Sequence, residues 1–298
     1  MKVEVTKIDK LKRVIKVNVD GERFAKDKNE FYTQAAKDIK VSGFRKGAAP
    51  MDIVEKHYGK ALKEEFANHY IQHQYYAQAV EDQKLVPAGM PRIFDVEIDD
   101  VSLKFSAEVE IRPELELDAK IYKGIVIKEK FPVVDDKDVE KVVDGIKEGL
   151  KKLTGNDLEG DILAHWSGHS HLITLKDSIK AEILTEKLRQ RRLKVDEEVA
   201  KHLLKEIALD LPKSEVDHYH QELVHRQIHN LEERGVSGED IEKYKKELED
   251  KLRPRAEDEV KLFYILRAIA VKENLKLEKD SNLGEIVLGY VLSQATYK

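Results

Sequence analysis

Between two helical patterns, at about 24–40 and from 51 onward, the chain carries the stretch Gly43-Phe44-Arg45-Lys46-Gly47-Ala48-Ala49-Pro50. Glycine adopts positive φ without steric cost, so the backbone can reverse sharply within this stretch. Phe44 has no core to enter from so short a loop, while Arg45 and Lys46 offer a planar guanidinium and a point charge to phosphate or carboxylate groups. The stretch therefore predicts a helical hairpin with a contact site at its tip. On the local pattern alone, a plain turn with solvated cations explains it equally well.

Strand patterns lie on both sides of this hairpin. Two alternating segments are expected within residues 1–20, and two more at 92–98 and 102–111. Pro113 stops the last of them because it has no backbone donor. Helical patterns fill 51–58 and 60–83. The first part of the chain is therefore predicted to be α+β, with an antiparallel sheet and a helical hairpin.

The remainder of the chain is predicted to be almost entirely helical. Residues 122–130 indicate one more strand or an extended arm, 135–153 a helix, and 155–170 a linker rich in Gly, Asp and His. The later helices are expected at about 175–191, 195–209, 213–234, 238–251, 255–275 and 281–295. Pro212 and Pro254 suit first helical turns, where the missing amide donor costs little. Apolar residues recur at spacings of three and four, which is typical of core-facing stripes.

Composition limits the classes of protein that fit this chain. With 298 residues it is long enough for about two domains, and its 37% charged residues and mean hydropathy of −0.55 favour a soluble protein. No apolar run approaches the roughly 20 residues of a membrane-spanning helix. The first residues lack the apolar segment of a secretory signal, and there is no cysteine, so a cytoplasmic location is expected.

Charge is distributed unevenly along the chain. Residues 1–60 contain 15 Lys and Arg against 9 Asp and Glu, a net charge of +6. The whole chain carries −5, so the remaining residues carry −11. A basic module on an acidic body is consistent with docking to a polyanion such as structured RNA.

Histidines provide the main candidates for metal binding. His165, His169 and His171 are close in sequence, and further histidines stand near each other in the pairs His69/His73, His225/His229 and His218/His220. No cysteine or assignable carboxylate ligand accompanies them, and no zincin-type glutamate stands beside the pairs. We expect solvated histidines and no metal site. The chain also lacks a phosphate-cradling glycine-rich loop and a nucleophile elbow, so neither an ATP-driven mechanism nor any cofactor is predicted.

The loop and three further motifs together resemble the bacterial trigger factor family of ribosome-associated chaperones. After Gly43 to Pro50 come Pro87-Ala88-Gly89-Met90-Pro91, then Glu108-Val109-Glu110-Ile111-Arg112-Pro113-Glu114-Leu115-Glu116-Leu117, then Arg253-Pro254-Arg255-Ala256-Glu257, in the family's order. The resemblance covers residues 1 to about 153 well and 172–275 more loosely. It implies a ribosome-binding domain at 1–118, an arm, helix and linker at 119–174, and a helical substrate-binding domain with arms at 175–298. The substrate-binding domain is expected to stand either alone or packed with helix 135–153.

The resemblance also implies how the loop is used. Its tip would dock on the large ribosomal subunit beside the exit tunnel, on a ribosomal protein and adjacent rRNA, through Gly43, Phe44, Arg45, Lys46, Gly47 and Pro50. Family members often have a further Lys where this chain has Ala48. One cation fewer would make binding weaker and its salt dependence shallower.

Family members commonly carry an FKBP-type prolyl isomerase domain, and residues 154–174 are far too few to form one. Trp166, the only tryptophan, lies in a setting unlike that pocket. The expected function is therefore that of a non-enzymatic, ATP-independent chaperone that shields apolar segments of nascent or unfolded chains. A ribosome-independent holdase or assembly scaffold, and a histidine-rich metal-binding protein, remain as alternatives. Homodimer formation is left open.

Overall fold

A four-stranded antiparallel sheet organises the N-terminal part of the chain. β2 (Lys12–Asp20) pairs with β1 (Lys2–Lys7) and with β4 (Ser102–Glu110), and β3 (Arg92–Ile98) completes the order β1-β2-β4-β3. Ile15, Val17 and Val19 alternate along β2 and are almost completely buried, which directs one face of the sheet to the core. The predicted strands and their antiparallel arrangement are confirmed.

Contacts divide the chain into two units in the computed structural model, which describes residues 1–278 and 282–298. One unit contains Met1–Leu115 and Leu209–Tyr264, and the other contains Glu116–Ala208 and Ile265–Lys298. The dividing line thus falls inside a long helix. The expected division into segments 1–118, 119–174 and 175–298 concerns stretches of sequence with separate roles, and it stays a prediction.

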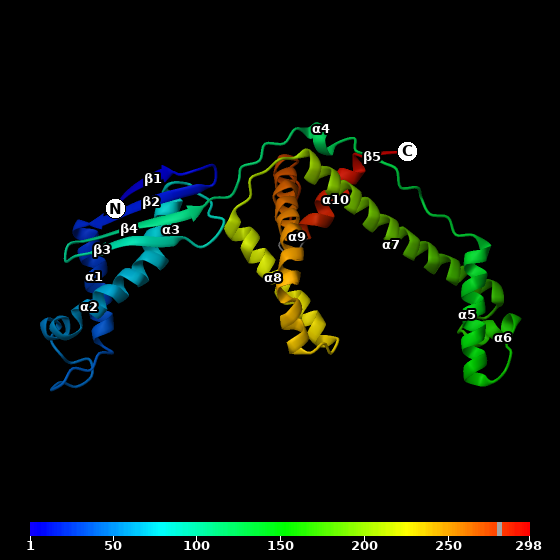
Figure 1. The fold of residues 1–298 in the computed structure, drawn as a ribbon, viewed down its shortest axis with the longest axis horizontal. Coiled ribbons are helices and arrows are strands. Elements are labelled where there is room, and N and C mark those ends of the chain that lie inside the picture. The colour runs from blue at the N-terminus through cyan, green and yellow to red at the C-terminus, as the bar shows by residue number, and fades with distance from the viewer. Residues whose placement is uncertain (279–281) are drawn as a thin grey trace. The chain divides into compact units, whose positions relative to one another are not determined.

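The helical hairpin packs on one face of the sheet (Figure 1). It consists of α1 (Gly21–Ala36) and α2 (Met51–Tyr70), and α2 continues through a π-helical turn (Ile71–Tyr75) into α3 (Tyr76–Asp82). Phe24 and Phe66 meet edge to face, with ring centroids 5.6 Å apart, in the core beneath the sheet. The expected interruption near Gly59 is wrong, because buried Val54 and Leu62 lie on either side of it on one continuous helix.

Two further helices of the first unit lie side by side. α8 (Lys213–Glu233) contacts α9 (Gly238–Lys272) through an ion pair between Asp217 and Arg253, 2.6 Å apart. Pro254 was expected in the first turn of a separate helix, but it lies inside α9. Ala256 and Val260 follow the proline and are buried, so their packing keeps the helix continuous past Pro254.

The second unit is mainly helical. α5 (Asp136–Thr154), α6 (Gly160–Trp166) and α7 (Leu172–Glu206) enclose a small core that includes Val139, Leu163 and Ile179. α6 lies within the expected linker at 155–170, because its buried Leu163 and Ala164 give it a core to pack on. α7 replaces the two helices expected at 175–191 and 195–209.

Short elements complete the second unit. They are α4 (Ala119–Tyr122), β5 (Val126–Ile127), α10 (Leu283–Ser293) and β6 (Thr296–Tyr297), and β5 pairs with β6 in parallel. The predicted strand or arm at 122–130 is therefore a two-residue strand within extended backbone. The helix expected at 281–295 is α10, and its first expected residue lies outside the described part of the chain. The fold class, an α+β N-terminal region followed by a helical C-terminal region, is confirmed.

Candidate functional site

The loop between α1 and α2 has the backbone that its glycines predict. Gly43 and Gly47 have φ of 88° and 75°, in the left-handed region. The two positions differ in their surroundings. A Cβ on Gly47 would lie 2.7 Å from the carbonyl oxygen of Lys37, whereas a Cβ on Gly43 would meet nothing within 4 Å. Gly47 is thus required both by its φ and by close backbone approach, and Gly43 by φ alone.

The base of the loop is anchored to the hairpin. Val41 is 4% exposed in the core, and the Tyr58 hydroxyl of α2 donates to the Lys40 carbonyl over 3.1 Å. The Gly47 N–H donates to the Ile39 carbonyl over 3.2 Å, and this hydrogen bond joins the end of the loop to its beginning. The Pro50 carbonyl accepts from the first turn of α2 and so begins that helix. These contacts give a fixed base to an exposed tip.

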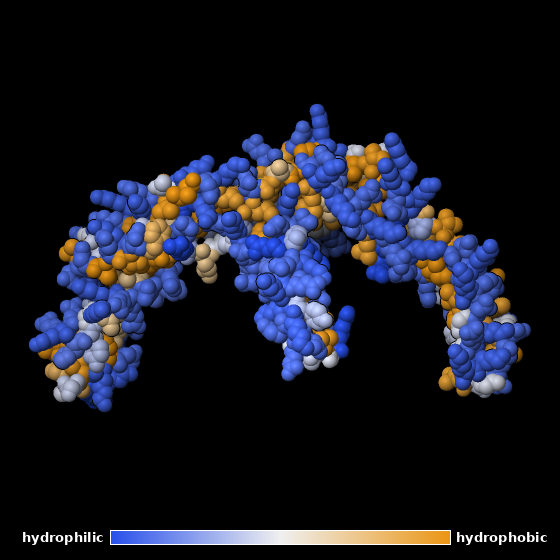
Figure 2. Space-filling view, viewed as in Figure 1, coloured by the Kyte–Doolittle hydropathy of each residue, from blue (hydrophilic) through white to orange (hydrophobic). Residues whose placement is uncertain are grey.

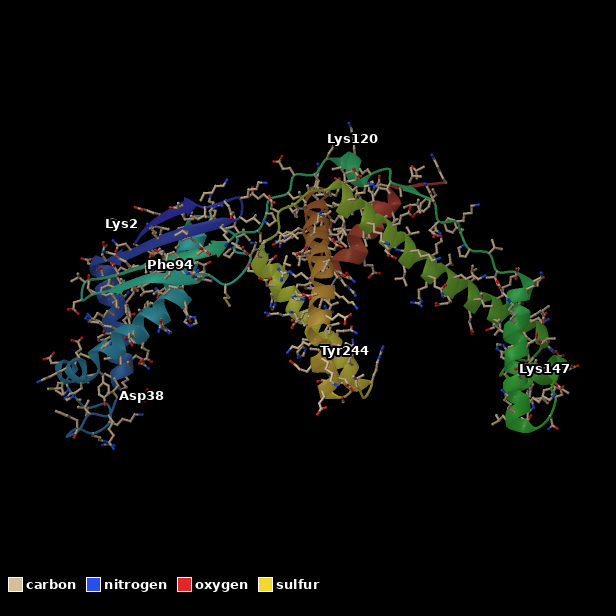
Figure 3. The ribbon with its side chains drawn as sticks, viewed as in Figure 1. Lys2, Asp38, Phe94, Lys120, Lys147 and Tyr244 are labelled. Atoms are coloured by element: carbon tan, nitrogen blue, oxygen red, sulfur yellow. The ribbon has the colours of Figure 1, made fainter. Side chains whose placement is uncertain are left out.

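The three side chains at the tip have different surroundings. Phe44 is 40% exposed, and Arg45 is exposed with no side-chain partner in the described part of the chain. Lys46 donates from Nζ to Asp38 Oδ1 over 2.7 Å, and this hydrogen bond lowers the pKa of the Asp38 carboxyl. Figure 3 shows Asp38 just beyond α1, at the base of the loop. The tip therefore offers one aromatic face, one unpaired guanidinium and one ammonium that is already engaged.

Asp38 and Tyr58 are the residues of this site that the sequence analysis missed. Neither is adjacent to the glycine-flanked motif: Asp38 precedes it in the turn after α1, and Tyr58 comes from the second turn of α2. The acidic residue eight positions before Lys46 was the available signal. It could not be used without knowing how the loop folds back.

A second feature is apolar surface on the α5–α7 region. The side chains of Leu153, Ile162, Trp166 and Ile173 are each more than half exposed. They flank the small core of α5, α6 and α7 without entering it. Figure 2 shows apolar surface over these helices among hydrophilic residues.

The histidines have mostly local contacts. His171 Nδ1 lies 3.2 Å from Asp161 Oδ2, and Asp161 also accepts the Leu172 N–H at the start of α7. The rings of His69 and His73 are 5.2 Å apart. Across residues 1–278 and 282–298, no group of three His, Cys, Asp or Glu side chains is placed to hold a metal ion. Over the same residues, no helix is long and apolar enough to cross a bilayer.

Comparison with known proteins agrees with this architecture. The family model for the bacterial trigger factor protein matches residues 1–146, and the model for the trigger factor C-terminus matches residues 171–281. The chain belongs to the trigger factor family. A solved trigger factor structure, reported for promiscuous substrate recognition in folding and assembly, superposes with a TM-score of 0.52. The match has 16% identity and covers 94% of this chain and 87% of that one, which supports the trigger factor fold.

Curated trigger factors match about half of the chain. The protein from Citrifermentans bemidjiense is 33% identical over 137 residues, or 45% of this chain and 31% of its own length. The Acetivibrio thermocellus protein is 34% identical over 149 residues, or 50% of this chain and 34% of its own. The matched part thus spans about a third of these trigger factors. Residues 147–170, which include α6, lie between the two family-model matches.

Proposed function

We infer that this trigger factor family member is an ATP-independent chaperone of the cytoplasm that docks at the ribosomal exit tunnel through the loop Gly43–Pro50. The observation that carries the proposal is the loop tip: Phe44 and Arg45 are exposed and stand on a base held by core packing and backbone hydrogen bonds. A preorganised tip loses little conformational freedom on binding. The partner is the large ribosomal subunit, with a ribosomal protein and rRNA beside the tunnel.

Electrostatics support a partner that carries phosphates. The loop lies in the first 60 residues, which have a net charge of +6 in a chain of net charge −5. Arg45 has no side-chain partner within residues 1–278 and 282–298, so it can donate two parallel hydrogen bonds to a phosphate without first breaking one of those contacts. Phe44 offers an aromatic face to an apolar pocket on a protein or to a base.

Client shielding is the second part of the proposal. The exposed side chains of Leu153, Ile162, Trp166 and Ile173 provide apolar surface of the kind that extended nascent segments can cover. Burial contributes about 25 cal/mol per Å², before the cost of ordering the client is subtracted. A few such contacts therefore give weak, reversible binding, which a chaperone needs in order to release its client.

The proposed function includes no prolyl isomerase step. Between the two family matches, residues 147–170 contain the end of α5, the short helix α6 and their connections. α6 packs with Leu163 and Ala164 against α5 and α7, so this segment completes a helical core.

Ribosome co-sedimentation tests the docking proposal. Replacing Phe44, Arg45 and Lys46 together by Ala is expected to abolish binding to ribosomes at moderate salt. The matched control is Lys2→Ala with Lys7→Ala, which removes two exposed cations from β1 and leaves the loop unchanged. The control is expected to bind ribosomes.

Two outcomes would contradict docking through this loop. If the triple variant still binds, the chain is better described as a ribosome-independent holdase or assembly scaffold. If the β1 control loses binding to the same extent, general positive charge is responsible. Light scattering on the same samples measures whether the free protein forms the homodimer that its exposed apolar surface would allow.

A further inference from the structure

A short parallel strand pair joins two distant segments of the second unit. The Thr296 N–H donates to the Ile125 carbonyl over 2.9 Å, and the Lys298 N–H donates to the Ile127 carbonyl over 3.1 Å. The Gly124 N–H donates in return to the Gln294 carbonyl over 3.0 Å. Residues 294–298 thus lie as an added strand along the edge of 124–127.

The two sides of this pair differ in how firmly they are held. On the β5 side, Ile125 and Ile127 are buried, so the receiving edge is part of the packed unit. On the β6 side, Thr296, Tyr297 and Lys298 are all exposed. A two-stranded ladder of this length is marginal in water, so the added strand can detach at low free-energy cost while the edge stays in place.

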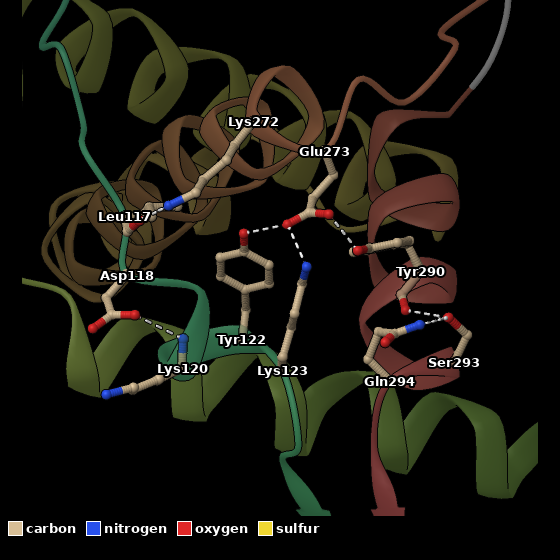
Figure 4. Close-up of polar contacts among 10 residues, drawn as sticks. All are labelled: Leu117, Asp118, Lys120, Tyr122, Lys123, Lys272, Glu273, Tyr290, Ser293 and Gln294. Carbon is tan, nitrogen blue, oxygen red and sulfur yellow. Dashed lines mark hydrogen bonds and ion pairs between the residues drawn. The ribbon is translucent and has the colours of Figure 1, made fainter.

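Contacts outside the strand pair hold α10 in the second unit. Glu273 accepts hydrogen bonds from Tyr122 of α4, 2.6 Å away, and from Tyr290 of α10, and it pairs with Lys123 at 2.8 Å (Figure 4). These contacts end at Tyr290, before the added strand begins. Residues 294–298 have their own backbone hydrogen bonds to the edge, and the Tyr297 hydroxyl also donates to the Leu292 carbonyl of α10 over 3.4 Å.

Next to the strand pair, an aromatic ring and a cation form a binding site for one side chain of the added strand. Arg191 of α7 stacks on Phe131, with its guanidinium carbon 4.0 Å from the ring centroid, and lies 5.5 Å from the ring of Tyr297. Arg191 is held there by hydrogen bonds to the Glu129 and Lys130 carbonyls, at 3.0 to 3.2 Å. Tyr297 thus meets a fixed cation and an aromatic ring, which favours an aromatic side chain at its position.

The site continues past the added strand. Residues 128–132 follow β5 directly and line an open cavity of about 660 Å³ together with Glu198 of α7. In the parallel register Val126 pairs with Thr296 and Ile127 with Tyr297, so a longer guest strand would run along residues 128–132 into this cavity.

We propose that the edge formed by residues 125–127, with the slot beside the stacked side chains of Arg191 and Phe131, binds extended polypeptide segments by strand addition, and that residues 296–298 are a displaceable occupant from the same chain. The guest is an unfolded segment with an aromatic residue at the position of Tyr297. Backbone hydrogen bonds give sequence-tolerant affinity, and the slot adds a preference for one aromatic side chain. This inference rests on the proposed shielding of client segments and names one place where they bind.

The test releases the strand and then supplies it as a separate peptide. Thr296→Pro combined with Tyr297→Ser removes the N–H that bonds to Ile125 and the ring that meets Arg191. The probe is a fluorescein-labelled peptide Ser-Gln-Ala-Thr-Tyr-Lys, matching residues 293–298, with a Tyr-to-Ser peptide as its partner, both measured by anisotropy. The released variant is expected to bind the Tyr peptide about tenfold more tightly than the unaltered chain. This factor corresponds to an unaltered chain in which the edge is free in about a tenth of the molecules. The Ser peptide is expected to show no such gain.

A matched pair of arginine variants locates the binding. In the released background, Arg191→Gln is expected to remove the gain, whereas Arg189→Gln, which alters an exposed arginine paired with Glu186 on the same helix, is expected to keep it. A photo-crosslinker at Val126, whose side chain is exposed, should capture the Tyr peptide in the released variant. Failure of the released variant to gain affinity, equal binding of both peptides, or loss of the gain in Arg189→Gln would overturn the proposal. Dimers of the unaltered chain that disappear on release would also overturn it, by assigning the edge to a second copy.

Failure here is distinguishable from failure of the proposed function. The released variant keeps the loop Gly43–Pro50, so its ribosome co-sedimentation and its suppression of client aggregation are measured in parallel. If both persist while peptide binding fails, the strand-addition site alone is excluded.

Discussion

At the scale of single residues, the pairing of Lys46 with Asp38 sets how many cations the loop has available. The ammonium is held by an exposed carboxylate whose pKa is lowered by that same hydrogen bond, so the pair is intact at neutral pH. A phosphate partner must compete with Asp38 for Lys46 and approach a negative charge. Arg45 faces no such competition in the described part of the chain.

Replacing Asp38 by Asn therefore tests the docking geometry. The variant is expected to bind ribosomes about threefold more tightly at low salt, because it frees Lys46 and removes one repulsive charge. Its binding should also depend more steeply on salt, since one more cation can displace counterions. Asp52→Asn, which removes an exposed charge in the first turn of α2, is the control and should change binding less. Equal effects of the two variants would show that Lys46 is not restrained by Asp38.

Glu273 makes stability depend on pH in the second unit. The ammonium of Lys123 and the hydroxyls of Tyr122 and Tyr290 lower the pKa of its carboxyl to about 2 from its ordinary 4.5. Because the pKa is depressed on folding, the stabilisation is fully present above about pH 4.5 and is lost as the pH falls towards 2. Glu273→Gln should lower the thermal midpoint at pH 7, and the difference from the unaltered chain should shrink between pH 4.5 and 2. A difference that is constant with pH would contradict the role of the ionised carboxylate.

At the scale of elements, α9 is continuous through Pro254, where a helix boundary was expected. Proline inside a helix removes one intrahelical hydrogen bond and crowds the preceding turn. The carbonyl that loses its donor is that of Asp250, four residues before the proline, and His220 of α8 donates from Nε2 to the neighbouring Glu249 carbonyl over 2.8 Å. The helix survives because its buried face, from Ala256 to Val260, stays in contact with its neighbours.

Pro254→Ala should accordingly stabilise the chain. Restoring the missing N–H is expected to raise the free energy of unfolding by about 1 to 3 kcal/mol, as measured by urea denaturation. Pro212→Ala is the control. Pro212 precedes α8, where a backbone N–H would have no intrahelical acceptor, so this substitution should change stability little. A destabilised Pro254→Ala variant would mean that the proline shapes α9 in a way its packing requires.

Sequence patterns predicted the strands and the loop correctly but misplaced several helix boundaries. Alternation predicted the four strands of the sheet correctly, most clearly in β2 and β4, which each bury one face, and the glycines of the 43–50 loop predicted its turn. The breaks expected near Gly59, residue 193 and Pro254 were wrong. Buried residues lie close to each expected break: Val54 and Leu62 on either side of Gly59, Val195 two residues after Leu193, and Ala256 two residues after Pro254. Their packing keeps each helix continuous. Local propensity is a weak signal that tertiary packing overrides.

At the scale of the whole molecule, the proposed function predicts an absence of catalysis. The chain is expected to show no acceleration of prolyl isomerisation on a tetrapeptide substrate above the uncatalysed rate, which is slow enough to follow directly. Suppression of aggregation of an unfolded client, measured on the same preparation, is the positive control for folded and active protein. Proline-specific catalysis would contradict the proposed function, which includes no prolyl isomerase step.

The family, the α+β and helical regions, and the loop Gly43–Pro50 could be predicted from the sequence, because they depend on local periodicity, on φ preferences and on residue types in order. Three contacts became visible only in the folded chain: Asp38 restrains Lys46, Glu273 joins α4 to α10, and residues 296–298 lie on the edge of β5. Each of these contacts joins groups whose proximity depends on how the chain folds back. The Thr296 strand meets Val126 across 170 residues of sequence, and a pairing of two residues leaves no pattern in either segment.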